Sequence, residues 1–217
     1  MEASKHLAEA TFRQGILLIY ISTDYVFPGT PGDAPYEADA KPGPTNLYGQ
    51  TKLDGEKVIL EATQGTGLGV VLRVPVLYGP ADEPKDSAVN VLMDALWKSQ
   101  EKGAKVKIDA WAQRYPTNTE DVARVCLDVS RTYLDSPEIR QRLPVVLQFS
   151  SEDKMTKYEI CQLFGDLMGL PMDGVLADSQ GGGPIASVQR RTYTWIPPFS
   201  SSAPIWNVQH AQKPVSR

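Results

Sequence analysis

Short apolar runs alternate with amphipathic segments over most of the chain. The runs at residues 16–21, 68–74 and 143–149 have the length of single strands, and their continuous hydrophobicity is typical of strands buried in a parallel sheet. Between and after them, the pattern predicts helices over residues 1–14, 46–63, 87–98, 119–134 and 156–168, and a further short strand over 105–108. Strands that alternate with helices predict an α/β fold, part of a doubly wound, Rossmann-like parallel sheet.

Two glycine-rich stretches raise the question of a phosphate-binding loop, which in a dinucleotide-binding fold follows a strand and opens a helix. The stretch 65–69 follows a predicted helix and precedes a strand, so we interpret it as a helix stop and a turn. The stretch 181–183 is followed by Pro184 and no helical pattern, which indicates a loop. Nothing before Ile16 supplies the turn, so we expect the pyrophosphate half of a cofactor site to be missing.

The helix predicted at 46–63 carries Tyr48 and Lys52, four residues apart. That spacing places both side chains on one face of the helix, about one turn from each other. A phenol titrates near pH 10, so acid catalysis at neutral pH requires a change equivalent to about 4 kcal/mol. A cation about 4 Å away, at an effective dielectric constant near 20, supplies a similar energy. The pair is a candidate acid–base site; the alternative is an amphipathic helix with an exposed lysine. On the same helix, Leu47, Val58, Ile59 and Leu60 are expected to face the core, and the charges of residues 54–57 are expected to be solvated rather than part of a site.

Composition narrows the class of protein. The 217 residues, 41% of them hydrophobic, suffice for one medium-sized domain with a core. A net charge of −4 and a pI of about 5.3 argue against nucleic-acid binding. Two histidines and two cysteines cannot supply a His/Cys metal cluster, and Cys126 and Cys161 suggest a reducing compartment without disulfides. With no signal-peptide core and no apolar run long enough to span a membrane, we expect a soluble, cytoplasmic protein.

Three motifs carry a resemblance to a known family. Residues 22–27 read STDYVF, residues 48–57 read YGQTKLDGEK, and residues 72–79 read LRVPVLYG. Together they resemble the extended short-chain dehydrogenase/reductase family, in particular its dTDP-4-dehydrorhamnose reductase-like members. The resemblance implies a doubly wound fold that binds NADP. The strand predicted at 16–21 ends at Ser22 and Thr23, which places them at its carboxyl end, where open α/β sheets bind their ligands.

The resemblance also implies roles for four residues. Tyr48 would donate or accept a proton at a substrate carbonyl, and Thr23 would hydrogen-bond that carbonyl. Lys52 would hold the nicotinamide ribose. Leu77 lies in the segment that packs beside the nicotinamide. The implied catalytic residues are therefore Thr23, Tyr48 and Lys52, and the implied cofactor contacts are Tyr48, Lys52 and Leu77.

Three further stretches, at 46–49, 113–117 and 156–159, are most similar to a regulatory, non-catalytic branch of this family. Proteins of that branch bind NADP and associate with the catalytic subunit of S-adenosylmethionine synthetase. The resemblance therefore implies a regulatory subunit with that partner. One alternative is an NADP-dependent reductase that acts at the 4-keto group of a sugar nucleotide. The other is a shortened chain with no independent function.

The resemblance and the composition divide the chain into two parts. Residues 1–178 are expected to form a truncated NAD(P)-binding, RmlD-like domain, and 179–217, rich in Gly, Pro and Ser, a divergent and disordered tail. Within the domain, Arg114 either faces a substrate or has a surface or ion-pair role. At helix starts, Thr45 or Asn46 is a candidate N-cap, and Thr156 with Glu159 a capping box.

Overall fold

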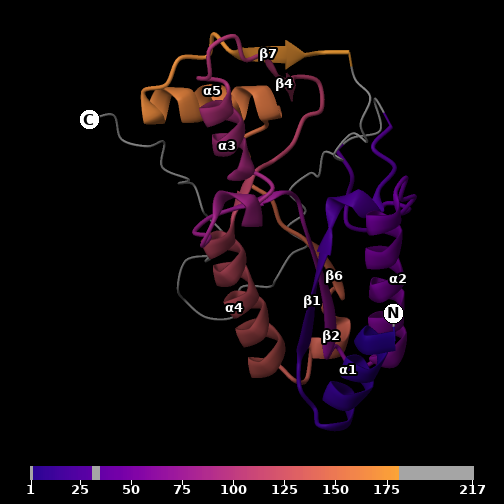
Figure 1. The fold of residues 1–217 in the computed structure, drawn as a ribbon. Helices are drawn as coiled ribbons and strands as arrows, with labels where there is room; N and C mark the ends of the chain where they lie inside the picture. Colours follow the sequence, from indigo (N-terminus) through magenta and orange to yellow (C-terminus); the bar gives the residue numbers. More distant parts are fainter. Residues whose placement is uncertain (1, 31–34, 181–217) are drawn as a thin grey trace.

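The computed structural model describes residues 2–30 and 35–180, and its central feature is a parallel sheet (Figure 1). Strands β1 (Leu18–Thr23), β2 (Gly69–Val74) and β6 (Val146–Gln148) pair in the order β1-β2-β6, both pairs parallel. The three strands predicted from the apolar runs therefore form one parallel sheet, as expected. The tail predicted at 179–217 lies, from residue 181 onward, outside the described residues.

Helices cover both faces of this sheet. Helix α2 (Leu47–Ala62) packs on β1 and β2 with α1 (Glu2–Arg13) against it, and α4 (Thr119–Asp135) lies on the opposite face (Figure 1). Strand β2 is buried along its whole length because both of its faces are covered. Alternation along β2 sends Val70, Leu72 and Val74 into the α4 layer, and Val71 and Arg73 toward α2. The predicted α/β class is confirmed.

A smaller lobe stands beyond the carboxyl ends of the main strands (Figure 1). It contains the parallel pair β4 (Val106–Asp109) and β7 (Val175–Asp178), with α3 (Val91–Lys98) and α5 (Lys157–Met168) packed together. Strands β3 (Leu77–Tyr78) and β5 (Thr117–Asn118) form a two-residue parallel pair. Strand β3 lies where the chain leaves β2 for the smaller lobe, and β5 lies where it returns to α4. The short 3-10 helices are η1 (Asp24–Val26), η2 (Pro84–Asp86) and η3 (Arg140–Arg142). The sequence pattern did not predict β7.

Local hydrogen bonds explain where the helices begin. The Asn46 side chain accepts from the Gly49 backbone N–H at 2.8 Å and caps α2. The predicted capping box at Thr156 and Glu159 is present at the start of α5. Helix α3 begins at Val91 rather than Ser87, because the Ser87 hydroxyl accepts backbone N–H groups that follow it and donates to the Leu77 carbonyl.

Two expectations for α2 were wrong. Leu47, expected in the core, is 79% exposed; it is the first residue of the helix, and the buried positions begin only at Gly49. Residues 54–57 were expected to be solvated charges, but Glu56 is only 2% exposed. Asp54 and Lys57, in contrast, form an ion pair at 3.7 Å with side chains that are 27% and 65% exposed. Glu56 differs because the helix turns it toward the sheet, where a buried arginine lies opposite.

That arginine is Arg73 of β2, 4% exposed, and it forms a two-pronged ion pair with Glu56. Its Nε donates to Glu56 Oε1 at 2.9 Å and its Nη2 to Glu56 Oε2 at 2.7 Å. The remaining Nη1 donates to the Ala38 carbonyl at 3.1 Å, and the guanidinium lies 5.0 Å from the centre of the Phe27 ring. The Ser22 hydroxyl also donates to Glu56 Oε1. One carboxylate thus joins α2 to β1 and β2.

We predict that Glu56→Gln lowers the free energy of unfolding by about 3–5 kcal/mol, because it leaves the Arg73 charge buried without its counter-ion. Urea denaturation measures this directly. Lys57→Ala is the matched control on the same helix: its side chain is 65% exposed, and its loss should cost less than about 1 kcal/mol. Equal costs for the two variants would contradict the assignment of a stabilising buried pair.

Candidate functional site

A cavity of about 570 Å³ opens at the carboxyl ends of β1 and β2. Thr23, Tyr48, Lys52 and Leu77 all line it, so the structure brings together the four residues singled out from the sequence. The rest of the lining is mostly small, apolar or hydroxyl-bearing: Ile21, Ser22, Tyr25, Val74, Pro75, Val76, Tyr78, Gly79, Pro80, Ala81, Asp86, Ser87, Ala88 and Thr119. A second cavity, of about 380 Å³, lies near 60–65 and Val145, away from these residues.

Two glycines of α2 let the helix lie close to η1 and to β1. A Cβ atom on Gly49 would lie 2.1 Å from the Tyr25 carbonyl oxygen, and one on Gly55 would lie 2.2 Å from the Tyr20 hydroxyl oxygen. Neither distance leaves room for a larger residue. Tyr48 itself is 54% exposed, and its ring packs edge-on against Tyr25 with 5.9 Å between the ring centres.

Lys52 points back from α2 to the edge of β1. Its Nζ donates to the Ile21 carbonyl oxygen at 3.1 Å. The same atom lies 5.3 Å from the centre of the Tyr20 ring and 6.0 Å from that of Tyr48. The ammonium group is therefore held at the cavity wall by a carbonyl and two aromatic faces.

The hydroxyls at the end of β1 are both engaged in local bonds. The Ser22 hydroxyl donates to Glu56, and that of Thr23 donates to Asp24 Oδ1 at 3.1 Å. Thr23 Oγ1 also accepts the Tyr25 backbone N–H at 3.2 Å and caps η1. A carbonyl ligand in the cavity would have to compete with Asp24 for the Thr23 proton.

Asp24, which accepts the Thr23 hydroxyl, is almost fully buried. Burial raises the pKa of its carboxyl to about 7, although bonds from Thr23 and backbone N–H groups and the charge of Arg114 act in the opposite direction. The folded chain therefore binds this proton more tightly than the unfolded chain. Stability contributed in this way is complete below about pH 4 and is lost as the pH rises through 7.

Replacing Asp24 with asparagine should remove much of that pH dependence, because the amide keeps the shape without the ionisation. Relative to the unchanged chain, we expect Asp24→Asn to gain on the order of 2–4 kcal/mol of unfolding free energy between pH 4 and pH 8. Urea midpoints at several pH values provide the measurement, with the exposed Asp153→Asn as the control. If Asp24→Asn and the unchanged chain lose stability in parallel, Asp24 is not the titrating group.

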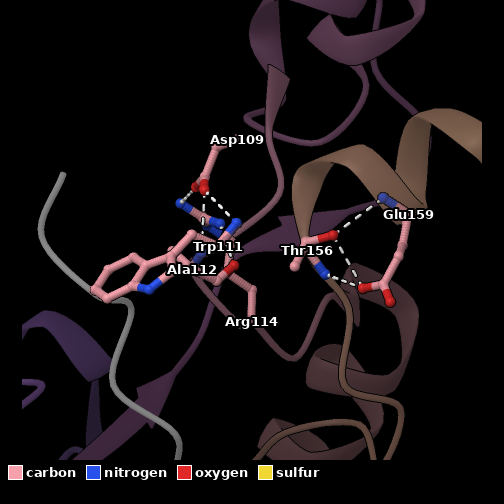
Figure 2. Close-up of polar contacts among 6 residues, drawn as sticks. All are labelled: Asp109, Trp111, Ala112, Arg114, Thr156 and Glu159. Carbon is pink, nitrogen blue, oxygen red and sulfur yellow. Dashed lines mark hydrogen bonds and ion pairs between the residues drawn. The ribbon is translucent and has the colours of Figure 1, made fainter. Parts of the chain in front are cut away.

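Arg114, for which the sequence left a substrate-facing role and a surface or ion-pair role open, forms an ion pair. It is buried, its Nη2 contacts Asp109 Oδ2 at 2.9 Å and its Nη1 donates to the Ala112 carbonyl at 2.7 Å (Figure 2). Burial alone would raise the pKa of Asp109, but backbone N–H groups of Ala112 and Trp111 and the Arg114 guanidinium outweigh it and lower that pKa. Arg114 does not line the cavity. It also pairs with Met155 through backbone hydrogen bonds, beside the Thr156 cap.

Several residues that line the cavity, and two that lie next to lining residues, Tyr20 and Asp24, were not singled out from the sequence. Tyr25 and Asp24 directly follow a strand, so their position at a carboxyl end was a usable signal. Tyr20 shares a face of β1 with Ser22, and period-two alternation could have placed it under α2. Ser87 and Thr119 reach the cavity from distant segments, and no local pattern indicates this.

Among the described residues, no cluster of three or more His, Cys, Asp or Glu side chains is suited to hold a metal ion, and the cysteines are free. Within the same residues, no helix has the length and hydrophobicity required to cross a membrane.

Comparison with known proteins defines the class. The RmlD substrate binding domain family matches residues 1–190, and the chain belongs to that family. It is 42% identical over 169 residues to methionine adenosyltransferase 2 subunit beta of Xenopus tropicalis, which covers 78% of this chain and 47% of that protein. It is 39% identical over 122 residues to dTDP-4-dehydrorhamnose reductase of Streptomyces griseus, covering 56% of this chain and 37% of that protein. The chain thus spans about half the length of the methionine adenosyltransferase 2 beta subunits it matches.

Solved structures agree on the fold. The dTDP-4-dehydrorhamnose reductase of Bacillus anthracis, determined in complex with NADP, superposes with a TM-score of 0.68 at 22% identity. The match covers 87% of this chain and 62% of the reductase. This likeness shows a shared Rossmann-like architecture. That reductase was determined with NADP, and another similar structure, the dTDP-glucose 4,6-dehydratase of Bacillus anthracis, was determined with NAD.

Proposed function

We propose that this chain acts as a regulatory, non-catalytic beta-type subunit of S-adenosylmethionine synthetase. In this proposal it binds the catalytic subunit in a reducing, cytoplasmic compartment and changes its activity without performing a reaction of its own. The observation that carries the proposal is the likeness to methionine adenosyltransferase 2 subunit beta, at 42% identity over 78% of the chain. The likeness to the dTDP-4-dehydrorhamnose reductase of Streptomyces griseus covers less of the chain, 56%.

The cavity has a role in this proposal as the nicotinamide-ribose end of an NADP site. Lys52 would hold the ribose, Tyr48 would stand beside the ring, and Leu77 would pack against it. The part of the chain that the structure describes contains no strand followed by a glycine-rich turn and a helix. The cofactor would therefore be held at one end only. Residues 1–178 would form the domain, with 179–217 as a separate tail.

The regulatory proposal is tested by adding the 217-residue chain to purified catalytic subunit of S-adenosylmethionine synthetase. Calorimetric titration should show saturable binding, and the rate of S-adenosylmethionine formation should change with the same midpoint. Tyr48→Phe, which removes one cavity hydroxyl from an exposed ring, should leave both results intact. The absence of binding together with an unchanged rate would reject the proposal and favour a chain without independent function.

A second candidate is an NADP-dependent reductase of sugar-nucleotide 4-keto groups. The meeting of Thr23, Tyr48 and Lys52 at one cavity favours it, because those residue types can place a hydroxyl, a proton donor and a cation around one carbonyl. The two candidates differ in their response to Tyr48→Phe. For a reductase, turnover should fall at least about a hundredfold, the lower range for the loss of a general acid. Turnover that survives the substitution would remove Tyr48 from a catalytic role.

The isolated chain should bind NADP weakly. In this fold the pyrophosphate is held by a glycine turn and a helix amino terminus, and each lost charge-assisted hydrogen bond weakens binding by about 1.5–3 kcal/mol. Several such losses place the expected dissociation constant at about 1 mM or weaker. Calorimetry with the folded chain provides the measurement. A dissociation constant below about 50 μM would contradict the prediction, because it requires contacts beyond the nicotinamide end.

A further inference from the structure

Two neighbours, the Ile21 carbonyl and the Tyr20 ring, fix the position of the Lys52 ammonium group. The backbone bond from Leu18 N–H to the Leu68 carbonyl, at 2.7 Å, sets the register of the β1–β2 ladder. In a parallel ladder, alternate residues bond to the same neighbour, so Leu18, Tyr20 and Ser22 face β2 and the Ile21 carbonyl faces the other edge of β1. Lys52 reaches that outward carbonyl from α2.

The Tyr20 ring forms the nearer aromatic wall beside this ammonium. Its centre lies 5.3 Å from Lys52 Nζ, closer than the 6.0 Å of Tyr48, whose ring is largely exposed. Tyr20 has little freedom to move, because its ring is wedged against α2: a Cβ on Gly55 would lie 2.7 Å from the ring carbon Cζ as well as 2.2 Å from the hydroxyl oxygen. Tyr48 lacks such a constraint from α2, since it lies in the first turn of the helix.

We propose that Tyr20 is the positioning residue for Lys52: its wedged ring and the Ile21 carbonyl hold the ammonium at the cavity wall before any ligand binds. A fixed cation in a mostly apolar and hydroxyl-bearing cavity suits a ligand that presents adjacent hydroxyls or an anionic group. Burial, with the neighbouring Glu56 and Tyr48, raises the pKa of the Tyr20 phenol, so the ring stays neutral over the physiological range.

This inference concerns the same site as the proposed function and rests on it for the identity of the ligand, the nicotinamide ribose. Its test needs neither that ligand nor the synthetase. Failure of the test would leave synthetase binding unaffected, and failure of synthetase binding would leave the position of Lys52 unaffected. The two claims can therefore be rejected separately.

The test compares Tyr20→Leu, which removes the aromatic face, with Tyr20→Phe, which keeps it and removes only the hydroxyl. The first readout is the ¹H–¹³C NMR signal of the Lys52 ε-methylene group, assigned by its disappearance in Lys52→Arg. In the unchanged chain and in Tyr20→Phe, we expect the ring current of residue 20 to displace this signal from the position of exposed lysines. In Tyr20→Leu, the signal should move back toward that position.

The second readout is the rate at which an acetylating reagent modifies Lys52, with Lys57 on the same helix as the internal reference because its side chain is 65% exposed. Tyr20→Leu should raise the ratio of the Lys52 rate to the Lys57 rate by about two- to fivefold, the range expected for loss of a cation–π contact near the surface. Tyr20→Phe should leave the ratio unchanged.

Three outcomes would overturn the proposal. The Lys52 signal and rate could stay unchanged in Tyr20→Leu, or Tyr20→Phe could alter them as strongly as Tyr20→Leu does, which would assign the effect to the hydroxyl. If Tyr20→Leu does not fold, the unchanged chain decides alone: a nuclear Overhauser contact between the Lys52 ε-protons and the Tyr20 ring protons supports the proposal, and its absence rejects it.

Discussion

The buried ion pair between Glu56 and Arg73 is the interaction on which the rest of the structure depends. A carboxylate and a guanidinium can be buried together only when each satisfies the other, and here two parallel hydrogen bonds do so. The remaining donor of Arg73 binds the Ala38 carbonyl, and Glu56 also accepts from Ser22. Four separate segments are therefore held in one arrangement by one pair of charges.

The position of the cavity follows from this arrangement. Glu56 sits one turn of α2 from Lys52 and two turns from Tyr48, so holding Glu56 in place fixes the rotation of the helix. The glycines at 49 and 55 then allow that helix to lie against η1 and Tyr20. Tyr48 and Lys52 reach the end of β1 because a charge deeper in the protein sets the orientation of the helix that carries them.

Much of the fold could be predicted from the sequence, because apolar runs and helix caps are local signals. The three main strands, their parallel pairing and the capping box at Thr156 followed from such signals. What failed depended on distant partners. Glu56 looks like its charged neighbours until Arg73, seventeen residues away, is placed opposite it. Leu47 looks like core because it is apolar, but it precedes the first buried position of α2, Gly49.

The candidate site shows the same division. Tyr48, Lys52, Thr23 and Leu77 were found by spacing and by motif, and they do meet at one cavity. The bonds that occupy them were not predictable. Thr23 is held by Asp24, and Lys52 by the Ile21 carbonyl and Tyr20, through contacts that exist only once β1 and α2 are packed together. Motifs therefore identified the groups, whereas packing decides what each group is free to do.

Amide hydrogen exchange tests most directly whether the buried pair holds these segments together. The measurement compares the unchanged chain with Glu56→Gln, residue by residue, under conditions in which both are folded. The account predicts that protection falls together in α2 and at the end of β1, while α5 in the smaller lobe keeps its protection. Unchanged exchange in α2, or an equal loss of protection throughout both lobes, would contradict it.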